Sequence, residues 1–261
     1  IYRASDHAFG SHYDEPYVSA LGYAESRDGI HFARDTQPLL TGATLAENRG
    51  LEDPRVSQID GEYFMVYTAY GTGDQIRLSL TRSHDLRHWG KRQILLDEQN
   101  KDGALLPERL HNRYYLFHRR PPSIWVAESE DLVEWYNHRV VMSPRSGMWD
   151  SVRIGVGAPP IRVPEGWLLI YHGVDKKNTY RLGAALLAPD DPGKVLARLD
   201  EPVLEPSLPW EREGLIPNVV FACGAVDMGD AFYVYYGAAD TCIGVAAAEK
   251  ATIRFARALP A

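Results

Sequence analysis

The sequence predicts an all-β fold, a five-bladed β-propeller, on three observations. The chain of 261 residues contains 17 Pro, 22 Gly, 15 Tyr and 6 Trp, and it has almost no long stretch with the 3.6-residue periodicity of helices. An aromatic strand segment recurs along the chain. A second strand, most often ending in a characteristic turn, follows each full copy at a similar distance.

The first repeated element is a turn residue followed by a strand that is apolar or aromatic on both faces. Its four copies occupy residues 61–67, 112–118, 166–172 and 230–236. The aromatic residues at the corresponding positions are 51, 53 and 65 residues apart: Tyr63, Tyr114, Trp167 and Phe232. Repeats of about 40–50 residues that carry several strands are typical of propeller blades. Because Ile1 to Arg3 resembles the end of a fifth copy, we expect five blades.

The second repeated element is a strand that ends in a Ser-x-Asp turn covered by an aromatic residue. Three copies occupy residues 23–32, 80–89 and 126–135, a fourth at 184–195 lacks the aromatic, and a fifth at 244–252 is shorter. Ser and Asp side chains in such turns bond the local backbone. A β-sandwich also has short strands and turns, but it would not repeat the same aromatic pairing, so the propeller is favoured.

Composition bounds the remaining possibilities. The chain carries 28 Lys and Arg against 35 Asp and Glu, which argues against a nucleic-acid partner, and no apolar run is long enough to span a membrane. Two cysteines, Cys223 and Cys242, predict two buried free thiols and a cytoplasmic protein. We expect a single propeller domain over residues 1–261. Ile1 begins within a strand, so the N-terminal part of the first blade is expected to be missing.

A polar loop before the first full repeat contains the first candidate site residue. Five charged groups lie between Glu47 and Val56, and an apolar strand follows. Pro54 biases Asp53 towards an extended conformation and fixes its direction. A carboxyl with an apolar strand behind it can have a raised pKa and act as a general acid. The alternative is a solvated turn held by salt bridges.

Four cationic side chains near strand ends of successive repeats form the second candidate group: Lys101, Arg119, Arg153 and His172. Each one alone more often packs its stem or pairs with an acid than binds a ligand. In a propeller, however, corresponding strand ends converge on one axial pocket. Arg binds phosphate or carboxylate with two parallel hydrogen bonds, and Lys supplies a compact charge. The group therefore predicts an anionic substrate such as phosphate.

The sequence shows no nucleotide-binding loop, zinc-protease motif, nucleophile elbow or dinucleotide fingerprint, so no metal and no cofactor are expected. Tyr, Trp and Asn near a pocket with carboxylates are typical of sugar binding, because they offer flat apolar faces and fixed hydrogen-bonding groups.

These residues resemble glycoside hydrolase family 130, five-bladed propellers that include β-mannoside phosphorylases and a few β-mannosidases. The resemblance runs from Tyr2 to Asp240, nearly the whole chain. Its strongest segments are 50–56, 101–107 with 118–119, 154–157 with 166–173, 214–221 and 236–240. A Glu-Asp-Pro loop alone is weak evidence for the family, but five motifs in the same order are specific to it.

The resemblance implies roles for ten residues. Asp53 would be the catalytic acid, delivering its proton through a hydroxyl of the bound mannose. Lys101, Arg119, Arg153 and His172 stand where the phosphorylases hold phosphate. Sugar-contacting positions would be Arg3, Asn48, Asp102, Tyr180 and Asp240. The Lys101-Asp102 pair departs from the Arg-Asn pair of some members. Members are often homo-oligomers, and they have a segment before the first strand that supplies further sugar contacts.

The implied reaction is inverting phosphorolysis of β-1,2- or β-1,4-linked manno-oligosaccharides, with inorganic phosphate as co-substrate and α-mannose 1-phosphate as product. Phosphate is itself the nucleophile, so only one protein acid is needed, whereas an inverting hydrolase needs a second carboxylate to activate water. Two alternatives stay open: a β-mannosidase with Glu213 or Glu52 as base, and a carbohydrate-binding propeller without catalysis.

Overall fold

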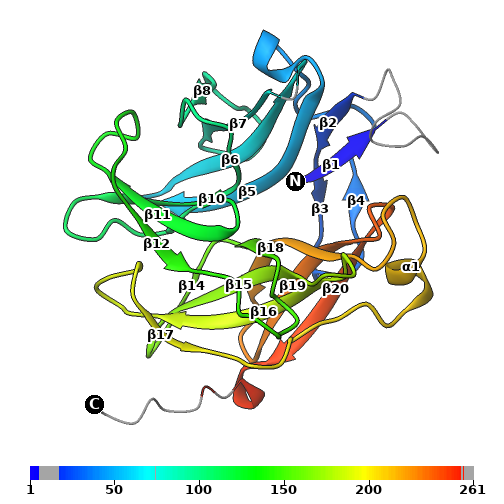
Figure 1. Cartoon of the computed structure of the whole chain (residues 1–261). Coiled ribbons are helices and arrows are strands. Elements are labelled where there is room, and N and C mark those ends of the chain that lie inside the picture. Colours follow the sequence, from blue (N-terminus) through cyan, green and yellow to red (C-terminus); the bar gives the residue numbers. More distant parts are fainter. Residues whose placement is uncertain (6–17, 74, 254, 256–261) are drawn as a thin grey trace.

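The computed structural model describes residues 1–5, 18–73, 75–253 and 255. It is all-β and propeller-like, with sheets grouped around a common centre (Figure 1). Regular helical structure in the described part is restricted to the four-residue α1 (Pro209–Arg212) and two 3₁₀ turns, η1 (Leu45–Glu47) and η2 (Lys250–Thr252). No helix in the described residues is long and apolar enough to cross a bilayer.

Most neighbouring strands within a sheet are consecutive in the chain. The first sheet has the order β1-β2-β5-β6-β7-β8. Its strands are β1 (Tyr2–Ser5), β2 (Ser19–Gly22), β5 (Gly50–Ile59), β6 (Glu62–Gly71), β7 (Gln75–Ser83) and β8 (Gln93–Ile94). Strand β2 joins β5 through one parallel bridge between Ser19 and Gly50. A separate hairpin pairs β3 (Ala24–Glu25) with β4 (Ala33–Arg34).

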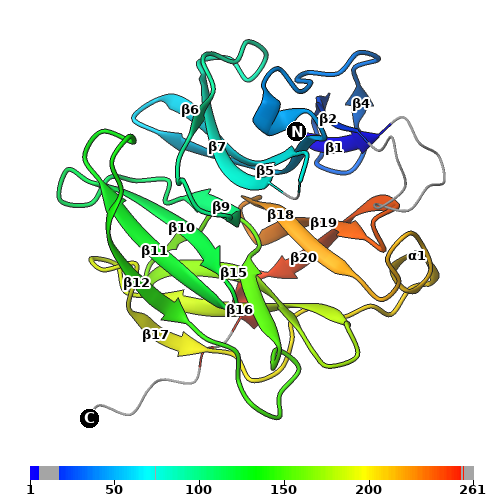
Figure 2. The same cartoon turned by 45° about the horizontal axis from the view of Figure 1, so that its top comes forward.

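Three further sheets complete the arrangement. The second contains β9 (Lys101–Leu105), β10 (Tyr114–Arg120), β11 (Ser123–Ser129) and β12 (Tyr136–Met142). The third contains β13 (Arg153–Val156), β14 (Ile161–Val163), β15 (Gly166–Val174), β16 (Tyr180–Leu187) and β17 (Val195–Arg198). The fourth contains β18 (Val220–Asp227), β19 (Ala231–Ala238) and β20 (Cys242–Glu249). Strand β5 contacts β1, β9 and β18, which places these first strands at the centre (Figure 2).

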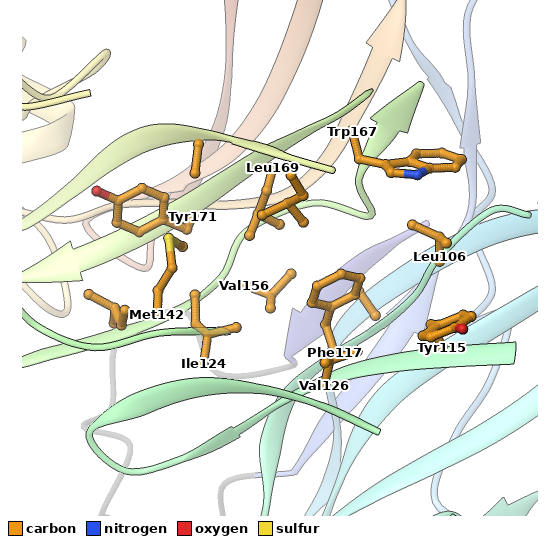
Figure 3. Close-up of a cluster of buried hydrophobic side chains, with 14 residues drawn as sticks. Leu106, Tyr115, Phe117, Ile124, Val126, Met142, Val156, Trp167, Leu169 and Tyr171 are labelled. Carbon is orange, nitrogen blue, oxygen red and sulfur yellow. The ribbon is translucent and has the colours of Figure 1, made fainter. Parts of the chain in front are cut away.

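The hydrophobic cores lie between neighbouring sheets, as expected when sheets pack face to face. Figure 3 shows the largest one, where Phe117 and Val126 of the second sheet meet Val156 and Leu169 of the third. Similar clusters join the first sheet to the second and the third sheet to the fourth. A fourth cluster packs Leu21 of β2 against β5 and β6.

Both predicted repeats are confirmed in the structure. The aromatic segments form β6, β10, β15 and β19, each the strand that pairs with an innermost strand. In the Ser-x-Asp turns, the Asp85 carboxylate accepts backbone hydrogen bonds from Arg87 and His88, and Asp28 and Asp131 do the same in their copies. The hydrogen bond between the His88 ring and the Asp85 carboxylate, together with these backbone bonds, holds the pKa of Asp85 below its usual range.

A polar clamp recurs inside each sheet. A side chain on the second strand hydrogen-bonds a polar residue in the segment that leads to the innermost strand. The pairs are Tyr67–Glu47 (2.6 Å), His118–Asn100 (3.0 Å), Tyr171–Asp150 (3.0 Å) and Tyr236–Glu211 (2.6 Å). Buried carboxylates need such partners, so each clamp fixes the chain just before it enters the centre.

Candidate active site

Asp53 lies in a β-bulge at the centre of the molecule. Glu52 pairs with Thr68 and Arg55 with Val66, so β5 carries one extra residue over this interval. Asp53 adopts a φ of 51°, in the left-handed region. The prediction that Pro54 makes Asp53 extended is therefore wrong, because the bulge requires a left-handed residue and Asp tolerates one. Bulges commonly re-aim side chains beside active sites.

The Asp53 carboxyl faces Lys101 on the neighbouring innermost strand, β9. Its Oδ2 lies 4.0 Å from Lys101 Nζ, and the two side chains are 13% and 30% exposed. Burial lowers the pKa of Lys101, but the charges of Asp53, Glu52 and Asp102 outweigh it and raise that pKa above the usual value. Lys101 therefore stays protonated next to an accessible carboxyl, as the sequence predicts.

Asp102 lies one residue further along β9, in a second bulge with a φ of 57°. It is fully buried, and its Oδ2 is 2.8 Å from Arg119 Nη1. Its Oδ1 is 3.7 Å from Arg55 Nη2. Burial raises the pKa of Asp102, but the charges of Arg119, Arg55 and Lys101 outweigh it and hold the pKa below its usual range. A side chain without exposed surface does not reach a sugar, so the sugar-contacting role for Asp102 is corrected to an internal one.

His172 on β15 is also fully buried, with Nε2 3.5 Å from Asp102 Oδ2. Burial lowers the pKa of His172 to about 3, an effect that the Asp102 charge only partly opposes. The ring is therefore neutral, and the prediction that His172 supplies a fourth cation is corrected. Gly155 makes this packing possible, because a Cβ there would lie 2.4 Å from both the Asp102 carboxylate and the His172 ring.

Arg153 opens β13 and donates a 2.6 Å hydrogen bond to the Tyr180 hydroxyl at the start of β16. The Tyr180 ring lies 6.0 Å from that of His172. Ile154 N donates to the carbonyl of Pro122, three residues after Arg119. The structure therefore brings the predicted phosphate-binding residues of the second and third sheets into one continuous group.

Three predicted sugar-contacting residues lie on other parts of the central face. Half-buried Arg3 of β1 reaches Glu52 and Asp240, each at 3.6 Å, and so joins the first sheet to the turn after β19. Asn48 is exposed before β5, and its amide is engaged with Thr72 through two hydrogen bonds of 2.9 Å. Arg3 and Asp240 are therefore linked to Glu52, the residue before Asp53, whereas the Asn48 side chain is already hydrogen-bonded within its loop.

Two central residues were missed by sequence reasoning. Arg55 is 1% exposed and binds groups from several sheets. Cys223 lies in a further bulge, on β18, and burial raises the pKa of its thiol to about 12, with Asp53 and Asp102 adding to the effect and Arg55 opposing it. Both cysteines are free, as predicted. The prediction that both are buried is wrong for Cys242, which is exposed at the start of β20, and Cys223 is only partly buried.

The contrast between the two thiols predicts selective labelling. Iodoacetamide at mildly alkaline pH should modify Cys242 at least about tenfold faster than Cys223, because the thiolate is the nucleophile and Cys223 is the more shielded and less ionised. Mass spectrometry of the labelled peptides measures the order. The variant Cys242→Ser should lose the fast phase, and faster labelling of Cys223 would contradict the assigned environment.

Buried neutral histidines predict a loss of stability in acid. His118 is clamped between Asn100 (3.0 Å) and His138 (3.1 Å), and burial lowers its pKa to about 3 from an ordinary value of 6.5. Between these values the unfolded chain binds a proton that the folded chain does not, so the free energy of unfolding falls as the pH drops below about 6.5. Urea unfolding at several pH values measures this slope. His118→Gln should flatten it, exposed His84→Gln should not, and equal slopes in all three would refute the cause.

The described residues contain no group of three or more His, Cys, Asp or Glu side chains placed to hold a metal ion. The centre instead offers an accessible carboxyl, Asp53, next to three cationic side chains, Lys101, Arg119 and Arg153. An acid beside a cluster of cations can protonate a leaving group while an anionic substrate is bound, which is the arrangement that a group-transferring enzyme needs.

Comparison with known proteins places the chain within that class. It belongs to glycoside hydrolase family 130, whose model, described as beta-1,4-mannooligosaccharide phosphorylase, matches residues 11–255. The resemblance stated from the motifs is thereby confirmed.

Similar proteins include two from Thermoanaerobacter sp. (strain X514). A 1,2-beta-oligomannan phosphorylase is 50% identical over 98% of this chain and 86% of its own length. A beta-1,2-mannobiose phosphorylase is 53% identical over 98% of this chain and 87% of its own length. The solved beta-1,2-mannobiose phosphorylase from Listeria innocua, in complex with beta-1,2-mannobiose, has a TM-score of 0.85 and 36% identity, covering 90% of this chain and 68% of that one.

Proposed function

We propose that the chain is an inverting β-mannoside phosphorylase that cleaves β-1,2-linked manno-oligosaccharides with inorganic phosphate. The observation that carries the proposal is the accessible carboxyl of Asp53, 4.0 Å from protonated Lys101 and adjacent to the Arg119–Asp102 pair. The β-1,2 linkage is favoured over β-1,4 because the relatives at 50% and 53% identity are both named for β-1,2 substrates.

In this proposal Lys101, Arg119 and Arg153 bind the phosphate dianion and align one of its oxygens with the anomeric carbon. That oxygen attacks from the face opposite the leaving group, so the new bond has the α configuration. The glycosidic C–O bond breaks as Asp53 delivers a proton to the departing oxygen through a mannose hydroxyl. The proton brought in by phosphate restores the Asp53 carboxyl, and no further cofactor takes part. Positioning and charge stabilisation supply most of the rate enhancement.

The remaining residues support the two substrates. Arg3, Tyr180 and Asp240 contact the sugar, and Asn48 borders the site through its loop. Asp102 holds Arg119 in place beneath the phosphate, and the neutral ring of His172 packs against Asp102. Of the two candidate bases for a hydrolase, Glu52 is 9% exposed and faces Arg3, and Glu213 is exposed after α1, so neither has the setting of an activated-water site.

We further propose that the whole chain is one propeller domain of five blades. Strands β1 and β2, the bridge from Leu21 to Leu40, and the β3–β4 hairpin supply a first blade. The ring closes where Tyr235 of β19 donates a 2.9 Å hydrogen bond to the carbonyl of Gly29 and packs its ring on Phe32.

The deciding experiment is turnover of β-1,2- and β-1,4-mannobiose with and without inorganic phosphate. We expect mannose 1-phosphate from the β-1,2 substrate, only when phosphate is present. Free mannose released at the same rate without phosphate would replace the proposal with a β-mannosidase, and sugar binding without turnover would replace it with a binding module.

A further inference from the structure

Arg55 lies buried where the four sheets meet. From β5 its guanidinium crosses to the third sheet, where Nε donates to Gly157 O at 2.7 Å and Nη2 donates to Val156 O at 2.8 Å. The face of the guanidinium lies 5.7 Å from the ring of Phe221 on β18. One side chain therefore ties innermost segments of three sheets together.

The same guanidinium holds the backbone of the acid. Arg55 Nη1 donates a 3.1 Å hydrogen bond to the carbonyl of Asp53, within the bulge. A left-handed backbone at a non-glycine residue persists only where its surroundings enforce it. This bond, together with the two to the third sheet, fixes the peptide that carries the Asp53 carboxyl.

Arg55 is also connected to the phosphate side of the centre. Its Nη2 lies 3.7 Å from Asp102 Oδ1, and the other oxygen of that carboxylate lies 2.8 Å from Arg119. Asp102 is fully buried and Arg55 is 1% exposed, so neither touches a substrate directly. The buried pair of Arg55 and Asp102 thus contacts both the backbone of Asp53 and the side chain of Arg119.

We propose that Arg55 is a positioning residue that sets the Asp53 acid and, through Asp102, the Arg119 phosphate ligand in one fixed geometry. The proposal rests on the proposed function. Only a planar fork with several donors can hydrogen-bond carbonyls on two sheets and lie within ion-pair distance of a carboxylate on a third, whereas Lys carries the same charge on a single nitrogen. Displacing a catalytic group by about 1 Å can cost about 100-fold in rate.

The test compares Arg55→Lys and Arg55→Gln with a matched control, Arg198→Lys. Arg198 also binds a backbone carbonyl, Ser143 O at 2.7 Å, and a buried carboxylate, Asp150 at 2.6 Å, but outside the active site. Each variant is assayed for kcat and for KM of mannobiose and of phosphate separately, beside its thermal unfolding midpoint.

We expect Arg55→Lys to lower kcat about 100-fold and raise the phosphate KM about tenfold, with the mannobiose KM within about threefold of wild type. Arg198→Lys should lower the unfolding midpoint and leave all three kinetic constants within about twofold. Three outcomes would overturn the proposal in favour of a structural role. A folded Arg55 variant could keep full activity. Both Arg55 variants could lose kcat to the same extent with unchanged phosphate KM, or both could fail to fold. If wild type turns over without phosphate, the proposed function fails, and kcat of the hydrolysis then tests Arg55, since the same acid is used.

Discussion

Replacing Asp53 with Asn is expected to lower phosphorolysis of β-1,2-mannobiose at least about 1,000-fold, because the departing oxygen loses its proton donor. The fold should survive: the amide is of similar size, and the bond between Arg55 and residue 53 uses the backbone carbonyl. Initial rates of mannose 1-phosphate release measure the loss. Asp227→Asn, which alters an exposed pair with Lys250, is the matched control and should retain wild-type activity.

An activated substrate makes this prediction specific to the acid. An aryl β-mannoside with a nitrophenyl leaving group needs little protonation, so Asp53→Asn should lose far less activity on it than on mannobiose. Equal losses on the two substrates would mean that Asp53 binds or positions the sugar instead of protonating it.

The second large effect is expected from Arg119→Gln. Arg119 is the proposed phosphate ligand and is 14% exposed, so its removal should raise the phosphate KM about 100-fold, on the scale of a lost charge-assisted hydrogen-bond pair. The KM for mannobiose should change little. Initial rates over a range of phosphate concentrations at saturating mannobiose give the value.

The adjacent residue provides the control. Arg120 follows on the same strand, but its side chain pairs with Glu98 at 2.7 Å and lies over the Trp125 ring, away from the centre. Arg120→Gln should leave both KM values unchanged. A loss of kcat in Arg119→Gln without any change in the phosphate KM would show that Arg119 serves the sugar or the acid rather than phosphate.

Much of this architecture could be predicted from the sequence because propeller repeats leave a periodic aromatic signal. The strands around Tyr63, Tyr114, Trp167 and Phe232 occupy equivalent places in four sheets. Residues at corresponding strand ends of a propeller converge on its centre. For this reason Asp53, Lys101 and Arg119 could be predicted to lie together. Strands β1 and β2 were harder to predict, because they are short and join β5 through a single bridge.

Side-chain direction could not be predicted at the bulges. A strand alternates its side chains strictly, and one extra residue reverses every direction after it. The bulges at Asp53 and Asp102 have no distinctive sequence signal. The sugar-contacting role of Asp102 was implied by the family resemblance alone, which does not show that the side chain is buried. His172 was counted as a cation because its neutrality depends on burial, a property of the assembled sheets.

Arg55 was missed for a related reason. It stands between Pro54 and Val56 in a segment that reads as a strand entering the core, and a charged residue there can either point to solvent or pair inside. An Arg directly after the Asp-Pro pair was the one available signal. Its partners are backbone carbonyls of residues 156 and 157, about 100 positions away, which no local pattern identifies.

The central claim, that phosphate rather than water attacks the anomeric carbon, is tested most directly by turnover of β-1,2-mannobiose in ¹⁸O-labelled water with unlabelled phosphate. Product analysis by mass spectrometry and NMR should show α-mannose 1-phosphate without ¹⁸O, formed in equal amount with the released mannose. Mannose carrying ¹⁸O at its anomeric carbon from the first turnovers, with no sugar phosphate, would contradict the account and assign the site to a hydrolase.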